Sequence, residues 1–220
     1  MAERSVRIYS IFERFWHWAQ ALSIFVLLVS GLRITGLHHA ISFKLAFTLH
    51  VGAAILLLVV WAFAIFWLMT TGAWRHYIPT AHGLLKVLRF YMYEVFEGAP
   101  HPYRKVYWHK HNPLQVLAYL ALKFVLFPAI WITGLFYLTY GFWATSPARA
   151  SWLPAIANVH IMAGFFIAAF VIVHVYLLTI GGDFKGHVRP MMTGFDKVNL
   201  TEAEEAYLTQ DQPEQIKPEP

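Results

Sequence analysis

The sequence predicts an all-α membrane protein, a bundle of four transmembrane helices with an amphipathic helix in one connecting loop. Its 220 residues are 58% hydrophobic and only 13% charged, which is too apolar for a soluble core of this size. Four stretches are long enough for the ~20 apolar residues that cross a bilayer as a helix, and basic residues gather in the connections. The chain has no cysteine, so it holds no disulfide, iron–sulfur cluster or covalently bound haem.

The first two spans each carry a histidine near their start. Residues 15–34 form the first apolar stretch, with His17 between two tryptophans that suit the membrane interface. This stretch is long for the apolar part of a secretory signal and no clear cleavage site follows it, so we expect a retained helix. The second span, residues 44–70, carries His50 in its first turns.

The connection between spans two and three is too polar to cross a membrane. Within it, residues 80–98 place apolar side chains on one side and charged ones off it, which predicts an amphipathic helix lying in the interface. The third span covers residues 113–140 and contains Lys123. A charge at that depth indicates either a function or a side chain that snorkels to the interface.

The fourth span, residues 154–181, carries two histidines on one face. His160 and His174 are fourteen positions apart, which on an α-helix is ~21 Å along the axis. Fourteen steps of ~100° end only ~40° short of four whole turns, so both imidazoles leave the helix in nearly the same direction. One helix therefore presents a nitrogen ligand near each side of the membrane.

The chain is expected to contain one domain and a tail. Residues 1–198 form the four-helix domain. Residues 199–220 are acidic and contain Pro and Gln, a composition that predicts a disordered tail.

The positions of the basic residues predict the orientation. The N-terminal segment, the connection between spans two and three and the C-terminal tail hold thirteen of the 17 Lys and Arg. By the positive-inside rule these segments face the cytoplasm, so both termini are cytoplasmic. Lipid headgroups and topology then explain the net charge of +5, and no nucleic-acid partner is expected.

This orientation gives each membrane histidine a depth. His17 and His174 fall towards the cytoplasmic side, and His50 and His160 fall towards the outer side. A lone histidine in a membrane helix is more often a hydrogen-bonded structural residue than a ligand. Four of them at two matched depths, with one helix contributing to both, favour two sites of two imidazoles each.

Two imidazoles per site favour haem over zinc. Zinc takes three or four protein ligands, and neither carboxylate nor thiolate accompanies these histidines. Two histidines are a natural axial set for a six-coordinate b-type haem, which has no open position for oxygen chemistry and transfers electrons. The residues expected to bind iron are His17, His50, His160 and His174.

Four features give the chain a resemblance to a known family. They are ERFWHW at the start of span one, the early histidine of span two, KHNPLQ entering span three, and the H-x13-H pair of span four. With them the chain resembles the four-helix, di-haem cytochrome b subunits of membrane-bound formate dehydrogenases, nickel–iron hydrogenases and thiosulfate reductases. These subunits belong to a wider cytochrome b561-like group, and the resemblance covers about residues 13–198.

The resemblance implies cofactors, a substrate site and a location. It implies two haem b groups, the inner one on His17 and His174 and the outer one on His50 and His160. It also implies a quinone site on the cytoplasmic side near the inner haem, in a bacterial inner membrane. The residues that it assigns to quinone are Asn112 and Gln115.

The KHNPLQ segment allows a simpler role and shows one departure from the family. Asn112 suits the N-cap of span three, with Pro113 at the first helical position, and this role does not exclude a second one in binding quinone. His111 stands where relatives often carry a tyrosine, so the details of the quinone pocket are expected to differ.

The function expected is electron transfer between a partner redox subunit on the outer side and the membrane quinone pool. Without cysteine the chain cannot supply the centre that oxidises or reduces the substrate. A partner is therefore expected, and the resemblance implies an iron–sulfur or other redox subunit of a hydrogenase, formate dehydrogenase or thiosulfate reductase type complex. Two alternatives stay open: a stand-alone superoxide oxidase-type di-haem cytochrome b561, and a haem-free transporter that uses the histidines as a proton relay.

Overall fold

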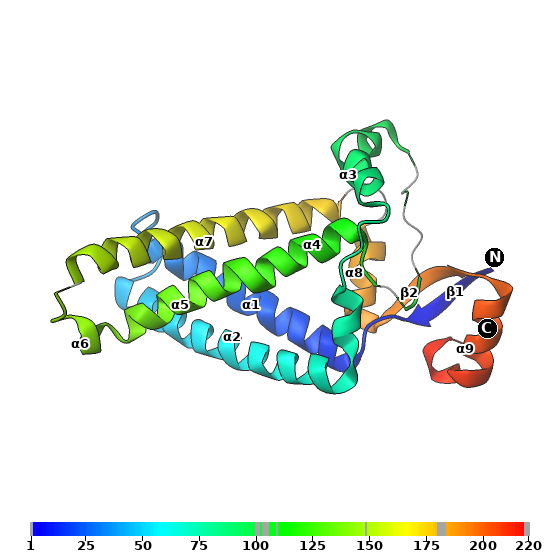
Figure 1. Cartoon of the computed structure of the whole chain (residues 1–220), viewed down its shortest axis with the longest axis horizontal. Coiled ribbons are helices and arrows are strands. Elements are labelled where there is room, and N and C mark those ends of the chain that lie inside the picture. Colours follow the sequence, from blue (N-terminus) through cyan, green and yellow to red (C-terminus); the bar gives the residue numbers. More distant parts are fainter. Residues whose placement is uncertain are drawn as a thin grey trace. The chain divides into compact units, whose positions relative to one another are not determined.

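Four long apolar helices dominate the computed structural model, which describes residues 2–99, 102, 106–108, 110–147, 149–179 and 184–217, and the backbone of residue 150. The helices that are long and apolar enough to span a membrane are Ile11–Ile34, Phe43–Thr71, Pro113–Leu138 and Ser151–Leu177 (Figure 1). The expected four-span helical fold is confirmed. The chain divides into two compact units, Met1–Leu114 with Leu177–Pro220, and Gln115–Tyr176.

The first unit contains two antiparallel helices, α1 (Ile11–Ile34) and α2 (Phe43–Thr71) (Figure 1). A capping box begins α1: the Ser10 hydroxyl accepts from the Glu13 N–H, and the Glu13 carboxylate accepts from the Ser10 N–H. These two bonds satisfy backbone donors that have no partner inside the helix. The second helix ends at Gly72, whose φ of +73° lies in the left-handed region that glycine adopts without strain.

Apolar and aromatic side chains hold α1 against α2. Trp16 of α1 is buried against Val60 and Ala64 of α2. One turn earlier, the Phe12 ring stacks on Trp67 with 5.2 Å between the ring centroids. The small Ala64 lets the indole approach the α2 backbone, as small residues do at helix contacts in membranes.

The polar connection after α2 folds as short helices: η1 (Ala73–Tyr77), α3 (Leu84–Met92) and η2 (Glu94–Glu97). The expected amphipathic helix is present as α3, which buries Val87 and Phe90 while Leu85 is 78% exposed. An exposed apolar side chain on such a helix suits contact with lipid. The helix is shorter than expected because the chain turns at Tyr93 into η2.

The two ends of the first unit form an ordered terminal module that the sequence analysis does not anticipate. It contains a two-stranded antiparallel sheet, in which Ala2 pairs with Leu200 and Arg7 with Phe195. Helix α8 leads into the second strand, and α9 and η4 follow it (Figure 1). The bounds are β1 (Ala2–Arg7), α8 (Phe184–Thr193), β2 (Phe195–Leu200), α9 (Glu202–Asp211) and η4 (Pro213–Gln215).

The expectation of a disordered tail is therefore wrong for residues 199–217; residues 218–220 lie outside the described part of the chain. Val6, Val198, Leu200 and Leu208 bury one another in a small core. A second capping box, in which Thr201 pairs with a glutamate three residues on, begins α9. The composition of the tail conceals this core because Val6 comes from the N-terminal strand and Val198 precedes the tail, so the tail alone contains only part of the core.

The second unit holds most of the remaining two spans. The third span is formed by α4 (Pro113–Ala121), η3 (Leu122–Leu126) and α5 (Phe127–Leu138), and α4 starts in the first unit. The short helix α6 (Tyr140–Trp143) follows, and α7 (Arg149–Leu177) contains the fourth span. Between α4 and α5 the helix widens into one π turn, where the Phe127 N–H bonds to the Leu122 carbonyl. Pro128 explains the turn, because it has no N–H and its ring presses on the carbonyl four residues earlier. Lys123 lies in this turn.

Candidate functional site

His50 is held by a hydroxyl from the neighbouring helix. It lies in the first turns of α2, and its Nδ1 is 3.0 Å from the Oγ of Ser30, near the end of α1. The Ser30 side chain is buried, with 1% of the residue exposed. The same oxygen lies 2.6 Å from the carbonyl oxygen of Val26.

These distances determine which nitrogen of His50 carries the proton. Two oxygens 2.6 Å apart need a hydrogen between them, and a carbonyl has none, so Ser30 must donate to Val26. A serine hydroxyl has only one hydrogen, so towards His50 it can only accept. The imidazole is therefore protonated on Nδ1, and its Nε2 carries the lone pair that a metal ligand requires.

His160 has the same arrangement in the second unit. Its Nδ1 lies 2.9 Å from the Oγ1 of Thr133 on α5, and Thr133 is buried, 7% exposed. The threonine hydroxyl donates to the carbonyl of Ala129 at 2.6 Å, so it too accepts from the histidine. His160 is again protonated on Nδ1, with the lone pair on Nε2.

A glycine beside each hydroxyl makes room for each imidazole. A Cβ atom on Gly31 would lie 3.3 Å from Cε1 of His50, and one on Gly134 would lie 3.4 Å from Cε1 of His160. The first distance is shorter than a comfortable contact between carbon atoms, and the second is at its limit. The pairs Ser30–Gly31 and Thr133–Gly134 therefore form two similar sites, here called histidine seats. Each consists of a hydroxyl that bonds the imidazole and a glycine whose missing side chain leaves room for it.

We expect Gly31→Ala to disturb the seat of His50. The new methyl would push the ring by a few tenths of an ångström and lengthen its bond to Ser30. Gly134→Ala should act on His160 in the same direction but more weakly, and Gly141→Ala, where a Cβ meets nothing within 4 Å, should have no effect. Haem content per protein, from the pyridine haemochromogen spectrum, should fall to about half for Gly31→Ala if one of two sites is lost. An unchanged content would contradict the tight seat.

The other two histidines lie about 20 Å from these seats along the helix axes, roughly two thirds of the ~30 Å hydrocarbon core. On α1, His17 precedes Ser30 by thirteen residues, ~20 Å along the axis, and on α7 His174 follows His160 by fourteen, ~21 Å. Both are half-buried; Trp18 meets the His17 ring edge-on at 5.1 Å, and Phe170 stacks on His174 at 6.0 Å. Each predicted pair takes one histidine from each unit, so the pairing itself stays a prediction.

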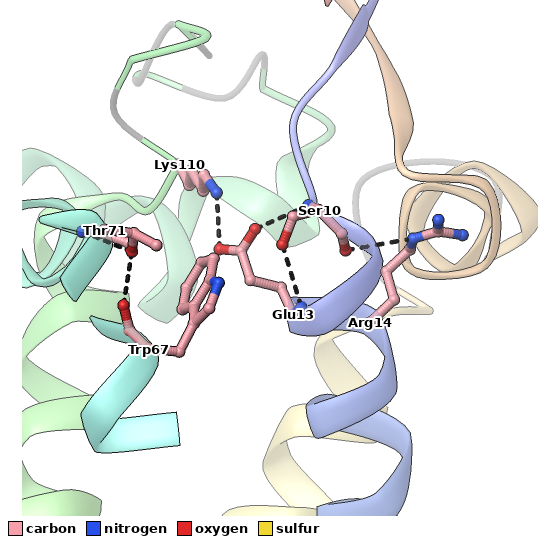
Figure 2. A network of polar contacts seen from close by, with 7 residues as sticks. Ser10, Glu13, Arg14, Trp67, Thr71 and Lys110 are labelled. Carbon is pink, nitrogen blue, oxygen red and sulfur yellow. Dashed lines mark hydrogen bonds and ion pairs between the residues drawn. The ribbon is translucent and has the colours of Figure 1, made fainter. Parts of the chain in front are cut away.

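A buried ion pair joins the two motifs that mark the start of α1 and the approach to α4. Lys110 Nζ lies 2.7 Å from Oε1 of Glu13, and the two side chains are only 10% and 12% exposed (Figure 2). The other oxygen of Glu13 accepts from the backbone N–H of Ser10. The ammonium also lies 5.5 Å from the centroid of the Tyr9 ring. Since Glu13 is one turn before His17, this pair anchors the KHN segment close to a candidate ligand.

The rest of the KHN segment is anchored within the first unit as well. His111 is buried and packs against the Tyr77 ring at 5.3 Å. Asn112 is 5% exposed, and its Nδ2 donates to the Tyr91 hydroxyl of α3 at 3.5 Å. Burial raises the pKa of Tyr91 above its usual value, an effect that the bond from Asn112 partly offsets, so the phenol is neutral at pH 7.

The structure places the second candidate quinone residue, Gln115, half-buried in the first turn of α4. Gln115 belongs to the second unit and Asn112 to the first, so their joint role stays a prediction. Among the residues that the structure describes, no three His, Asp or Glu side chains gather as they would around zinc.

Comparison with known proteins supplies the identity of this arrangement. A family model described as prokaryotic cytochrome b561 matches residues 8–194. The chain belongs to the prokaryotic cytochrome b561 family. It is also similar to the Escherichia coli K12 protein named "Putative cytochrome YdhU", with 29% identity over 202 residues that cover 87% of this chain and 75% of the relative. No solved structure matches the chain.

Membership confirms the expected class: a membrane electron-transfer protein of the cytochrome b561 type, whose family implies haem b. The donors fit that cofactor. His50 and His160 are both fixed in the tautomer that leaves Nε2 to a metal, and neutral imidazole is an axial ligand of low-spin haem. Haem iron supplies reversible one-electron transfer when it is bound.

Sequence reasoning missed the residues that hold the ligands. Ser30–Gly31 and Thr133–Gly134 read V-S-G-L and I-T-G-L in spans one and three, a repeat that is visible in the sequence. Glu13 and Lys110 lie inside the ERFWHW and KHNPLQ motifs, yet nothing in either motif indicates that they meet. Only the packing of the first unit shows that contact.

Proposed function

We propose that this cytochrome b561-family chain is a di-haem membrane anchor subunit of an oxidoreductase complex. It would transfer electrons between a partner redox subunit on the outer side and quinone near the cytoplasmic side. His50 and His160 would hold the outer haem, and His17 and His174 the inner one. The observation that carries the proposal is the pair of equivalent histidine seats, each with a second histidine about 20 Å along its own unit.

The chain's own residues would do three things for electron transfer. The four imidazoles would hold the two haems, which would supply reversible one-electron transfer when bound. The hydroxyls of Ser30 and Thr133 would hold two of these rings in place. The apolar helices would keep water away from both sites, and electrons would then pass across the membrane from one depth to the other.

The terminal module supports the proposed orientation. Strands β1 and β2 come from opposite ends of the chain and pair along their whole length, so both ends lie on one side. An even number of spans requires this arrangement. With the basic residues of the termini and of the connection between α2 and α4, it favours both termini in the cytoplasm of a bacterial inner membrane.

The proposed partner is suggested by the lack of cysteine. The chain has no thiolate ligands for an iron–sulfur cluster, so a substrate-oxidising or substrate-reducing centre of that kind would lie in another subunit. We propose an outer-side redox subunit of the hydrogenase, formate dehydrogenase or thiosulfate reductase type. Membrane lipid and quinone would be its other partners.

The quinone site is tested by removing the amides of Asn112 and Gln115 singly. An amide that donates to a quinone carbonyl contributes ~0.5–1.5 kcal/mol. Asn112→Ala or Gln115→Leu should therefore slow re-oxidation of the reduced haems by a quinone analogue about tenfold and leave both haem spectra unchanged. Stopped-flow absorbance in the α-band gives the rates.

A matched control for these variants lies in the terminal module. There Gln212 also donates its amide to a tyrosine hydroxyl, that of Tyr207, at 3.2 Å, so Gln212→Leu should not change the rate. Unchanged rates in both Asn112→Ala and Gln115→Leu, with normal spectra, would remove these two residues from the quinone site.

A further inference from the structure

The two histidine seats share a feature that simple helix packing does not require. Ser30 and Thr133 each donate to the carbonyl four residues earlier and also accept from a histidine on another helix. Ser23, elsewhere on α1, donates to the Ala19 carbonyl at 2.8 Å, and in the described part of the chain no histidine is recorded as its hydrogen-bond partner. It is equally buried, 2% exposed. The second bond of Ser30 and Thr133 is therefore specific to the histidine seats.

We propose that Ser30 and Thr133 are positioning residues that lower the reduction potential of the outer haem. Each would do so by accepting a hydrogen bond from the Nδ1–H of one ligand histidine. The proposal rests on the proposed function, which makes His50 and His160 the two ligands of that haem. It adds that both histidines assigned to this haem donate to a buried hydroxyl, one in each unit of the chain, and that each hydrogen bond lowers the reduction potential.

The direction of the effect follows from charge. An imidazole whose N–H is drawn towards an oxygen acceptor becomes a more electron-rich ligand. Oxidised iron carries one more positive charge than reduced iron, so the oxidised form benefits more from such a ligand, and the reduction potential falls. Without the acceptor the oxidised form loses this advantage, and the haem becomes easier to reduce.

Because both hydroxyls are buried, water should not replace either one after it is deleted, and the change in reduction potential should be measurable. Ser30 is 1% exposed and Thr133 7%, and deleting a single oxygen leaves too little space for a water molecule to replace it. Ser30→Ala therefore leaves the Nδ1–H of His50 without this acceptor. The lost bond should change the ratio of oxidised to reduced haem at a fixed ambient potential about tenfold, which for a one-electron couple is about 59 mV.

The test is an optical redox titration of the purified full-length protein. In wild type we expect two b-haem components. Ser30→Ala should raise the potential of one component by about 59 mV and leave the other in place. Thr133→Ala should raise the same component by a smaller amount, because the backbone of Ile130 also bonds the His160 ring, and the two shifts should add when combined. Ser30→Thr and Thr133→Ser keep the acceptor and should stay close to wild type. Ser23→Ala removes an equally buried hydroxyl from α1 and should shift neither component.

Three outcomes would overturn the inference: no shift in either alanine variant with haem content retained, an equal shift in Ser23→Ala, or shifts in two different components. If Ser30→Ala fails to retain haem, Ser30→Cys provides the second test. A thiol is a weaker acceptor of similar size, so a smaller upward shift in the same component is expected. Wild-type protein that contains no haem would overturn the proposed function, whereas two haems with unmoved potentials would overturn this inference alone.

Discussion

Replacing His50 with alanine should remove one of two haems and leave the other spectroscopically intact, and His160→Ala should remove the same one. His17→Ala and His174→Ala should both remove the other. A b-type haem is held by its axial ligands and its packing alone, since the chain has no cysteine to bind it covalently. Loss of one imidazole therefore opens one coordination position and weakens retention of that haem. Haem content should fall from two per chain to one.

Redox titration of the four variants identifies which haem each has lost. Variants that lose the same haem should retain the same potential and the same α-band maximum. His39→Ala is the matched control, because this exposed histidine lies in the connection between α1 and α2 and is not among the predicted ligands. Two observations would contradict the pairing: His50→Ala and His17→Ala abolishing the same haem, or all four variants retaining both.

Breaking the buried ion pair between Glu13 and Lys110 should have the largest effect on stability. Glu13→Gln would leave the ammonium of Lys110 buried, and Lys110→Met would leave the carboxylate, in a place where each side chain is about 10% exposed. Removing one partner of a buried pair typically costs about 3–5 kcal/mol. For a chain of this length, that cost lowers the midpoint of thermal unfolding by roughly 10 °C.

Thermal unfolding in detergent, followed by circular dichroism, measures this effect. The double variant Glu13→Gln/Lys110→Met leaves no unpaired charge and should recover most of the loss. The pair formed by Lys197 and Glu3 in the terminal module is the control, because its side chains are 68% and 56% exposed. Lys197→Met should change the midpoint little, as exposed ion pairs contribute about 0–1 kcal/mol. Equal losses in the two single-lysine variants would contradict the importance of burial.

The pair also bears on function through its position. Glu13 is one turn before His17 on α1, and Lys110 is two residues before Asn112. A loosened pair should therefore affect the site assigned to the inner haem more than the one assigned to the outer haem. The difference would appear as a shift in one redox component alone.

The four spans and their histidines could be predicted from the sequence because both depend on local properties. A run of apolar residues needs no partner to be recognised as a membrane helix. The fourteen-residue spacing of His160 and His174 places both on one face by helix geometry alone. The amphipathic α3 was found for the same reason, since its apolar face follows from the period of its own residues.

The terminal module could not be predicted in this way. Its core joins Val6, at one end of the chain, to Val198 and Leu208 at the other, and no single segment contains enough apolar residues to indicate a fold. The strands pair across nearly the whole length of the sequence. Composition therefore indicated disorder where a long-range contact imposes order.

By itself, the sequence determined the class of this protein, its four spans, its lack of cysteine ligands and the spacing of the histidines along their helices. Only the tertiary structure decided which atom of His50 and His160 can bind a metal. The tautomer of each histidine follows because the hydroxyl of Ser30 or Thr133 has one hydrogen and donates it to a backbone carbonyl. The histidine is thereby made the donor. Such a contact lies between helices, and neither helix alone shows it, because hydrogen-bond direction depends on distances that only packing sets.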